Sequence, residues 1–281
     1  MILPFTKMQS LGNDFVVIDG IGNRVPVGKD FAARIADRRF GIGCDQILLV
    51  EEGDHNADFK FRIFNQDGSE VGQCGNGARC FARYVVDNNL WHRDTMTAKT
   101  LTTSIRMVLE DDGTVSVDMG APVFDPDSIP LNADNEQTGY DFVSTQGSVK
   151  FGAVSMGNPH AVIEVEDVGT APVGRLGAEL QQSSIFPESV NVGFMAMQSR
   201  NCIDLRVFER GVGETMGCGS GACAAVVYGI STGKLSPSVT VNLPGGAAVV
   251  SWDGRGSAVT LRGSAETVFE GEIDVSEFAA S

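Results

Sequence analysis

The sequence predicts an α+β protein of two pseudo-symmetric domains, each a mixed or antiparallel sheet wrapped round a central helix. The first observation is a glycine-rich segment that occurs twice: residues 64–78 read FNQDGSEVGQCGNGA and residues 208–222 read FERGVGETMGCGSGA. Cys74 and Cys218 stand at the same place in the two segments, 144 positions apart. The other two observations are a strand pattern before each cysteine and a helical pattern after it.

Each cysteine segment follows a stretch with the period-two alternation of a strand that has one buried face. Residues 58–64 (DFKFRIF) match residues 202–208 (CIDLRVF) at the same offset of 144. Residues 12–19 (GNDFVVID) match residues 157–164 (GNPHAVIE) at an offset of 145. Three matches in the same order indicate an internal duplication, and two copies are too few for a solenoid.

After each cysteine, the apolar residues change to helical spacing. In the first copy this pattern runs over residues 78–86 and stops at the polar stretch 87–89. In the second copy, residues 222–229 are apolar on nearly every side, which is typical of a buried helix. Each copy therefore predicts a strand, a glycine-rich turn that carries the cysteine, and a central helix.

The rest of the chain is rich in predicted strands. Residues 102–110 and 114–119 flank Asp-Asp-Gly, and residues 249–252 and 258–261 flank Asp-Gly-Arg-Gly, both typical of hairpins. The Pro-, Asp- and Asn-rich stretch 120–140 is the expected connection between the halves. Short amphipathic helices are predicted at 31–39 and 174–182.

Composition narrows the class of protein. A formal net charge of −15 argues against nucleic acid and anionic membrane surfaces as partners, because both require a basic patch. The first residues lack a secretory signal pattern, and nowhere do about 18 apolar residues run uninterrupted. Six irregularly spaced cysteines fit a reducing compartment better than a disulfide scaffold. We therefore expect a cytoplasmic protein.

The cysteine motif suits acid–base chemistry. Cys-Gly-x-Gly before a helix places a thiol where backbone N–H groups lack intrahelical partners, and these dipoles lower a thiol pKa. The same amides can hold a substrate carboxylate, which acidifies the adjacent Cα–H. If each half supplies one thiol to opposite sides of a shared cleft, one removes a proton while the other delivers one. The pair thus predicts an epimerase or racemase that needs no cofactor.

Other interpretations of the cysteines are weaker. A lone cysteine is usually a small buried hydrophobe, and that reading is favoured for the unmatched Cys44, Cys80, Cys202 and Cys223. A zinc site fails on spacing, since Cys80 aligns with Ala224 rather than with Cys223. A dithiol redox protein would need Cys-x-x-Cys or an adjacent resolving thiol. Neither a dinucleotide fingerprint nor a P-loop lysine occurs.

The chain resembles the diaminopimelate epimerases, pyridoxal-independent enzymes that interconvert LL- and meso-diaminopimelate on the route to lysine and peptidoglycan. The resemblance runs nearly end to end. Its motifs are LGNDF at 11–15, GIGCDQ at 41–46, FNQDGSE at 64–70, CGNGAR at 74–79, MGNPH at 156–160, ERGVGET at 209–215 and GCGSGAC at 217–223. Departures are small: Ser10, Gly217 and Ser220 replace commoner glycine, alanine and threonine, and Ser220 keeps the hydroxyl.

The resemblance implies roles for individual residues. Cys74 and Cys218 become the acid–base pair, with His160 and Glu209 tuning their pKa values. The reacting carboxylate would be bound by backbone amides of Gly75, Asn76, Gly219 and Ser220. The rest of the substrate would be held by Asn13, Gln46, Asn65, Asn158, Asn191, Glu209 and Arg210. Amides suit a zwitterion and an arginine can clamp a carboxylate. No metal and no cofactor is expected.

Several of these residues also have purely structural interpretations. An asparagine in a Gly-Asn turn often only caps a loop, Arg210 could be a solvated charge, and a lone histidine is more often a satisfied core residue. His160 and Glu209 correspond to Phe15 and Asn65 in the other copy. We expect this asymmetry to leave one cysteine as the thiolate and the other as the thiol in the free enzyme.

The resemblance also implies domain bounds. The N-terminal domain would span residues 1–118, the C-terminal domain residues 119–263, and a strand near 266–273 within 264–281 would return to the first domain. A homodimer is expected, with Phe269 in the contact. The alternatives are a proline or hydroxyproline racemase, a phenazine-type isomerase on the same scaffold, and a non-enzymatic amino acid binding protein.

Overall fold

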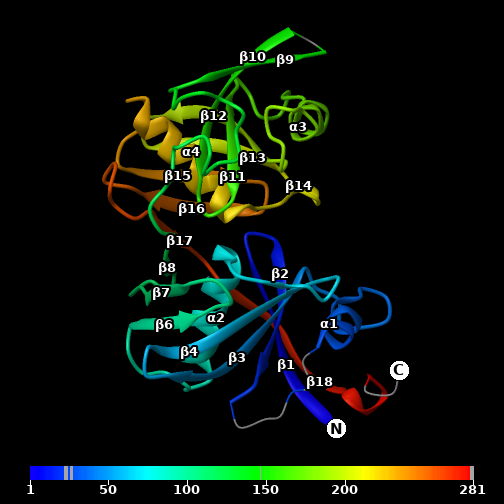
Figure 1. Cartoon of the computed structure of the whole chain (residues 1–281). Coiled ribbons are helices and arrows are strands. Elements are labelled where there is room, and N and C mark those ends of the chain that lie inside the picture. The colour runs from blue at the N-terminus through cyan, green and yellow to red at the C-terminus, as the bar shows by residue number, and fades with distance from the viewer. Residues whose placement is uncertain (22–24, 26–27, 146, 279–281) are drawn as a thin grey trace. The chain divides into compact units, whose positions relative to one another are not determined.

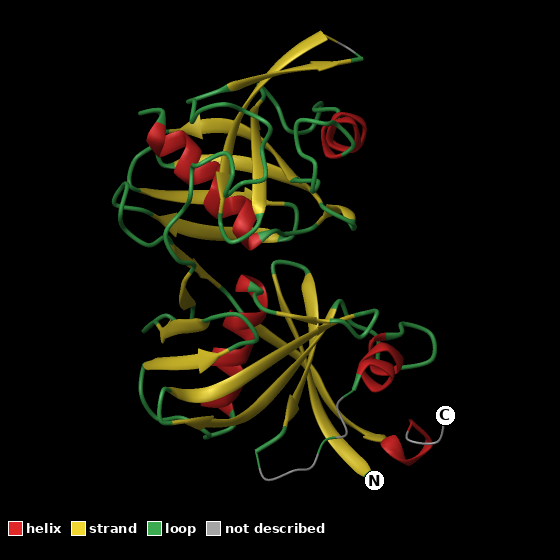
Figure 2. Ribbon diagram, viewed as in Figure 1, coloured by secondary structure: helices red, strands yellow, loops and turns green. Residues whose placement is uncertain are grey.

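The chain divides into two compact units in the computed structural model, which describes residues 1–21, 25, 28–145 and 147–278. The first unit comprises Met1–Val117 and Gly263–Ser281, and the second comprises Asp118–Arg262. These bounds lie one residue from those expected from the sequence. Both units combine a mixed sheet with few helices (Figure 2), so the predicted α+β class with two repeated domains is confirmed.

The first unit is a mixed sheet around one long helix (Figure 1). The sheet order is β18-β1-β2-β3-β4-β6-β7-β8, with β5 paired to the end of β4, and the β2–β3 and β4–β6 pairs are parallel. The strands are β1 (Ile2–Ser10), β2 (Asn13–Asp19), β3 (Gln46–Asp54), β4 (Ala57–Asn65), β5 (Glu70–Val71), β6 (Thr95–Lys99), β7 (Ser104–Leu109), β8 (Val115–Asp118) and β18 (Glu266–Asp274). The helices are α1 (Lys29–Ala36), α2 (Gly75–Asp87) and the 3-10 turn η1 (Val275–Phe278).

The second unit repeats this plan. The order β9-β10-β11-β12-β13-β15-β16-β17 carries β14 on the end of β13, and the β11–β12 and β13–β15 pairs are parallel. The strands are β9 (Tyr140–Ser144), β10 (Gly147–Ser155), β11 (Pro159–Glu164), β12 (Asn191–Ser199), β13 (Cys202–Glu209), β14 (Gly213–Thr215), β15 (Ser238–Leu243), β16 (Gly246–Ser251) and β17 (Thr260–Gly263). The helices are α3 (Val173–Gln181) and α4 (Gly219–Ser231).

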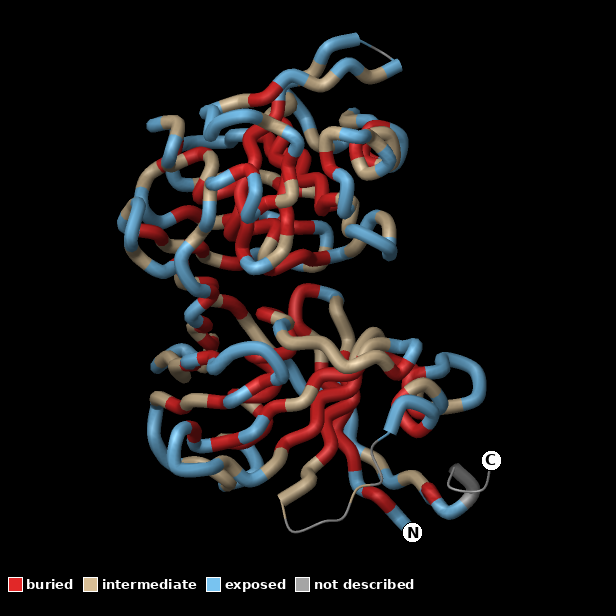
Figure 3. Tube along the Cα trace, viewed as in Figure 1, coloured by how far each residue is buried: buried red, intermediate tan, exposed pale blue. Residues whose placement is uncertain are grey.

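The helix after each cysteine packs inside its unit, where the buried residues gather (red in Figure 3). Helix α2 packs on β1, β2, β3 and β7, and α4 packs on β10, β11, β12 and β16. Residues 222–227 of α4 are fully buried, as the all-round apolar pattern predicts. Because each helix is enclosed, its N-terminus is fixed by the surrounding sheet, and so is the cysteine that precedes it.

Some elements differ from the sequence-based expectation. The helix expected at 31–39 ends at Ala36, because Asp37 adopts extended backbone with φ −62° and ψ 124°. The short strands β5 and β14 were not predicted, since two or three residues are too few to show a period. In the part of the chain that the structure describes, every helix is too short or too polar to cross a lipid bilayer.

Candidate active site

Cys74 caps the N-terminus of α2. Its backbone is extended, and its sulfur accepts a hydrogen bond from the backbone N–H of Gly77 at 3.3 Å. The side chain is partly exposed, whereas Gly75 and Asn76 behind it are buried. The thiol therefore lies at the positive end of the helix dipole, where an anion is favoured.

The polar residues expected near Cys74 form two close pairs. Asn13 Oδ1 lies 3.9 Å from Cys74 Sγ, and Gln46 Nε2 donates to Asn65 Oδ1 at 2.9 Å. The second pair follows from register, because Gln46 of β3 lies opposite Asn65 of β4. Among the described residues no group hydrogen-bonds the buried Gln46 Oε1. That oxygen is an acceptor suited to an ammonium group.

The side chain of Asn76 has a different partner. Its Oδ1 accepts a hydrogen bond of 2.7 Å from Arg79, one turn along α2. Arg79 is fully buried and also donates to Ser10 Oγ at 2.8 and 3.0 Å. Asn76 can therefore offer its backbone amide at the helix N-terminus while its side chain braces the first turn. Sequence reasoning missed Arg79, although it ends one of the motifs.

Cys218 caps α4 and is buried, with 5% of its surface exposed. Its sulfur lies 3.1 Å from Glu209 Oε2 and 3.6 Å from Ser220 Oγ. Thr215 Oγ1 donates to the other carboxylate oxygen of Glu209 at 2.5 Å. Burial, and then the charge of Glu209, raise the pKa of Cys218 well above its ordinary value. The arrangement favours the thiol, with its S–H directed at the carboxylate.

His160 contacts an asparagine rather than a thiol. Its Nε2 lies 3.0 Å from Asn158 Oδ1, and Asn158 Nδ2 donates to Ser220 Oγ at 3.3 Å. His160 is 1% exposed, and burial, reinforced by the charge of Arg210, lowers its pKa to about 3. The imidazole is therefore neutral at physiological pH. Among the described residues, Asn158 and Ser220 link it to Cys218.

Asn191 and Arg210 lie at the end of the β12–β13 pair. Asn191 is buried, and its Oδ1 accepts a bond of 2.9 Å from the backbone N–H of Arg210. The Arg210 side chain is exposed and donates to the carbonyl oxygen of Glu188 at 3.0 Å. Asn191 therefore orients the chain at Arg210 and leaves most of the guanidinium open.

An arginine–glutamate pair precedes each cysteine and was not predicted. Arg62 of β4 donates to both oxygens of Glu70 in β5 at 2.9 and 2.8 Å. Arg206 of β13 does the same to Glu214 in β14 at 2.6 and 2.9 Å. Two parallel bonds fix both position and direction. The repeated arginine and glutamate were visible in the sequence at the offset of 144.

The second glycine after each cysteine leaves room for the sulfur. A Cβ on Gly77 would lie 3.3 Å from Cys74 Sγ, and one on Gly221 would lie 3.3 Å from Cys218 Sγ and 3.0 Å from Val207. Contacts this short are tighter than a packed interior allows without movement. This explains the second glycine of Cys-Gly-x-Gly in both copies.

Phe269 is exposed, whereas three of the four unmatched cysteines are buried. Phe269 of β18 is 47% exposed, and its ring meets Phe5 edge-on with centroids 6.0 Å apart. Cys44, Cys80 and Cys223 are buried, and burial raises the pKa of Cys44 to about 12. Cys202 is only partly buried, so the buried reading was wrong for it. It begins β13 on a face where Asn242 Nδ2 lies 3.5 Å from its sulfur.

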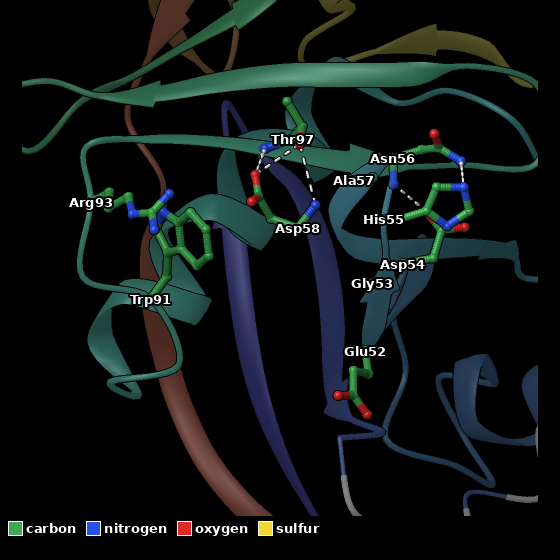
Figure 4. A pocket seen from close by; sticks show the side chains of 10 residues that line it. All are labelled: Glu52, Gly53, Asp54, His55, Asn56, Ala57, Asp58, Trp91, Arg93 and Thr97. Carbon is green, nitrogen blue, oxygen red and sulfur yellow. Dashed lines mark hydrogen bonds between the residues drawn. The ribbon is translucent and has the colours of Figure 1, made fainter.

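A hollow lies at the β3–β4 hairpin (Figure 4), and its lining includes none of the predicted site residues. Two of its carboxylates, Asp54 and Asp58, already accept hydrogen bonds. Asp54 accepts from the backbone N–H of Asn56 at 2.8 Å, and Asp58 accepts from Thr97 N and Oγ1 at 2.8 Å. These contacts shape the hairpin, and the hollow is unrelated to the cysteines.

Solved structures of epimerases and racemases share this fold. A hydroxyproline epimerase from Agrobacterium vitis matches with a TM-score of 0.71 at 15% identity, over 97% of this chain and 92% of that one. A probable proline racemase from Agrobacterium radiobacter K84 matches with a TM-score of 0.71 at 14% identity, over 99% of this chain and 94% of that one. A PhzF-family phenazine biosynthesis protein from Bacillus anthracis matches with a TM-score of 0.70 at 14% identity, over 98% of this chain and 99% of that one. The chain therefore has the fold of a class of proteins that includes an epimerase and a racemase.

Sequence comparison gives the family within that class. A sequence model of the diaminopimelate epimerase family matches residues 5–124 and 152–268. The protein named diaminopimelate epimerase in Teredinibacter turnerae (strain ATCC 39867 / T7901) is 48% identical over 274 residues, which cover 97% of this chain and 99% of that relative. The chain belongs to the diaminopimelate epimerase family and is an isomerase. The predicted family is confirmed.

Proposed function

We propose that this protein is a diaminopimelate epimerase, which interconverts LL- and meso-2,6-diaminopimelate for lysine and peptidoglycan synthesis without a cofactor. Its acid–base residues are Cys74 and Cys218, one from each unit. One observation carries the proposal: each thiol lies at a helix N-terminus and has a hydrogen-bond acceptor close to its sulfur. The acceptor is Asn13 Oδ1 for Cys74 and Glu209 Oε2 for Cys218. Family membership supplies the substrate.

The reaction needs one base and one acid. A cysteine thiolate removes the α-proton and becomes a thiol, while the electron pair of the C–H bond moves toward the carboxylate. The other cysteine then delivers its S–H proton to the opposite face of Cα and is left as the thiolate. Backbone amides of Gly75, Asn76, Gly219 and Ser220 stabilise the charge that develops on the carboxylate.

The two thiols differ in their surroundings. Burial, and then the charge of Glu209 at 3.1 Å from the sulfur, raise the pKa of Cys218 and favour its thiol form. The corresponding residue in the first unit is the neutral Asn65. We infer that Cys218 is the more firmly protonated of the two thiols in the resting enzyme. Glu209 tunes Cys218 directly, and His160 acts through Asn158.

The distal end of the substrate also needs binding groups, because only one of its two amino acid centres is inverted. Amides and an arginine suit a zwitterion, and these are Asn13, Gln46, Asn65, Asn158, Asn191, Glu209 and Arg210. The open acceptor Gln46 Oε1 suits the ammonium group, and the exposed Arg210 suits the carboxylate. We also propose a cytoplasmic homodimer with Phe269 in the contact.

The experiment is solvent-deuterium uptake at Cα of LL-diaminopimelate, without pyridoxal phosphate, by the wild type, Cys74→Ser and Cys218→Ser. Uptake by the wild type and loss of epimerisation in both variants is the expected result. Uptake from proline but not from diaminopimelate would overturn the substrate. Saturable binding without uptake, unaffected by either substitution, would overturn the enzymatic proposal.

A further inference from the structure

The carboxamide of Asn13 lies between Cys74 and a carboxylate that the predicted site does not include. Asn13 Nδ2 donates to Asp45 Oδ2 at 2.7 Å, while Asn13 Oδ1 lies 3.9 Å from Cys74 Sγ. An ionised carboxylate can only accept hydrogen bonds, so the Asn13 atom that faces Asp45 must be the nitrogen. The carbonyl oxygen is consequently the atom left to face the thiol.

Asp45 is itself held by a network of ions. Arg38 donates to Asp45 Oδ1 at 2.8 Å and to both oxygens of Asp14 at 2.6 and 2.9 Å. Lys7, which is buried, lies 2.6 Å from Asp14. Burial opposes the charge of Asp14, but hydrogen bonds from Arg38 and Lys7 outweigh it and hold the pKa of this carboxyl far below its ordinary value.

Backbone bonds tie the two carboxylates together. The N–H of Asp45 donates to Asp14 Oδ1 at 2.9 Å, and the N–H of Asp14 donates to Asp45 Oδ2 at 3.2 Å. One oxygen of Asp45 thus receives two donors, Asn13 Nδ2 and the Asp14 N–H. The other oxygen receives Arg38. This fixes the carboxylate in position and direction.

The second unit holds its matching asparagine the other way round. Asn158 directs its oxygen to His160 and its nitrogen to Ser220 Oγ, which lies 3.6 Å from the Cys218 sulfur. The positions that correspond to Asp14 and Asp45 are Pro159 and Val190, so the second unit has no carboxylate at either position. The ion network belongs to one copy only.

We propose that Asp45 is a positioning residue, which locks the Asn13 carboxamide so that its oxygen accepts the S–H of Cys74. The proposal rests on the function proposed above, since it assigns one more residue to the Cys74 half of that site. Without Asp45, the Asn13 amide can rotate and offer an N–H to the sulfur. A donor favours the thiolate, whereas an acceptor favours the thiol.

Two substitutions separate positioning from charge. Asp45→Ala and Asp45→Asn each remove one negative charge. Only Asp45→Asn retains a side-chain oxygen that can accept from Asn13. In that variant the oxygen should face Asn13 Nδ2 and the Asp14 N–H, and the new amide nitrogen should face Arg38. The charged groups in the network are Lys7 on β1, Asp14 on β2 and Arg38 after α1, while Arg79 of α2 binds Asn76 beside Cys74. They are the same in both variants.

The assay is the alkylation rate of Cys74 by iodoacetamide as a function of pH, resolved by mass spectrometry of peptides from the full-length protein, with Cys218 as internal control. We expect Asp45→Ala to raise the Cys74 rate at neutral pH about threefold to tenfold, the range expected for exchanging one hydrogen-bond acceptor for a donor. Asp45→Asn should raise it less than about twofold, and Cys218 should be unchanged in both variants.

Asn13→Leu provides a second test if Asp45→Ala fails to fold, because it removes the acceptor and keeps the ion network. It should also raise the Cys74 rate, and adding Asp45→Ala to it should change Cys74 no further. Equal effects of Asp45→Ala and Asp45→Asn, or an additive double variant, would overturn the positioning role. The readout needs no turnover, so an inactive wild type would refute the proposed function without touching this result.

Discussion

Replacing Glu209 with glutamine should lower the pKa of Cys218. Two unit charges 3.1 Å apart, the separation of Cys218 Sγ and Glu209 Oε2, repel by about 5 kcal/mol at an effective dielectric constant of about 20. Glu209 is only partly buried, so solvent screens part of this repulsion. We expect roughly 1.4 to 2.8 kcal/mol to remain, a tenfold to hundredfold gain in the thiolate fraction below the pKa.

Glutamine keeps the rest of the geometry. Its oxygen can still accept from Thr215, and its amide nitrogen then faces the Cys218 sulfur as a donor. Loss of the repelling charge and gain of a donor both favour the thiolate. If the resting thiol is the proton donor, epimerisation by the variant should decline at a lower pH than in the wild type, because a thiolate has no proton to deliver.

The assay is thiolate absorbance in the ultraviolet against pH, taken as the difference between each protein and its Cys218→Ala counterpart. Glu179→Gln is the matched control, since Glu179 also accepts from a threonine hydroxyl, that of Thr145 at 2.6 Å, in the same unit. An unchanged titration of Cys218 in Glu209→Gln, or an equal change in Glu179→Gln, would refute the reasoning.

Three further predictions follow from the contacts described. Gly221→Ala should lower the free energy of unfolding by about 1–3 kcal/mol through crowding at the cysteine, and should also lower kcat. The control is Gly174→Ala, where no atom lies within 4 Å of the added carbon, and it should leave thermal stability unchanged or raise it. His160 stays neutral in the folded protein, so its contribution to stability is complete above the ordinary pKa of 6.5 and is lost as the pH falls toward 3. Between pH 7 and pH 5, the free energy of urea unfolding should fall by about 2 kcal/mol more in the wild type than in His160→Phe. Equal decreases in the two proteins would contradict this. Arg206→Lys and Glu214→Gln break one bidentate pair from either side, so both should lower kcat by a similar factor, and unequal losses in steady-state assays would count against a shared role.

The repeated architecture was predictable because its signals are local. The strands that end at Phe64 and Phe208 and the helices that begin after Cys74 and Cys218 carry period-two and helical patterns within a few residues. The strands β5 and β14 carry no such signal. They exist because an arginine on the preceding strand binds a glutamate eight positions along the chain.

The candidate site was predictable by residue type but not by orientation. The glycine-rich turns indicate where the thiols lie, and the family motifs indicate which amides surround them. Nothing in the segment around Asn13 indicates which atom of its amide faces the sulfur, because Asp45, 32 positions later, decides it. The partner of His160 is likewise the nearby Asn158 rather than a thiol, which only the folded geometry reveals.

The last strand of the first unit is made after the whole second unit. Strand β18 pairs with β1 along nearly its full length, from Ile2 opposite Asp274 to Gln9 opposite Glu266. On the ribosome, the second unit is therefore the one whose residues are all available first. Until residue 263 and beyond emerge, β1 has one open edge, and an open edge invites pairing with another chain. Slow translation of the end of the message should thus prolong an aggregation-prone state of the half that carries Cys74.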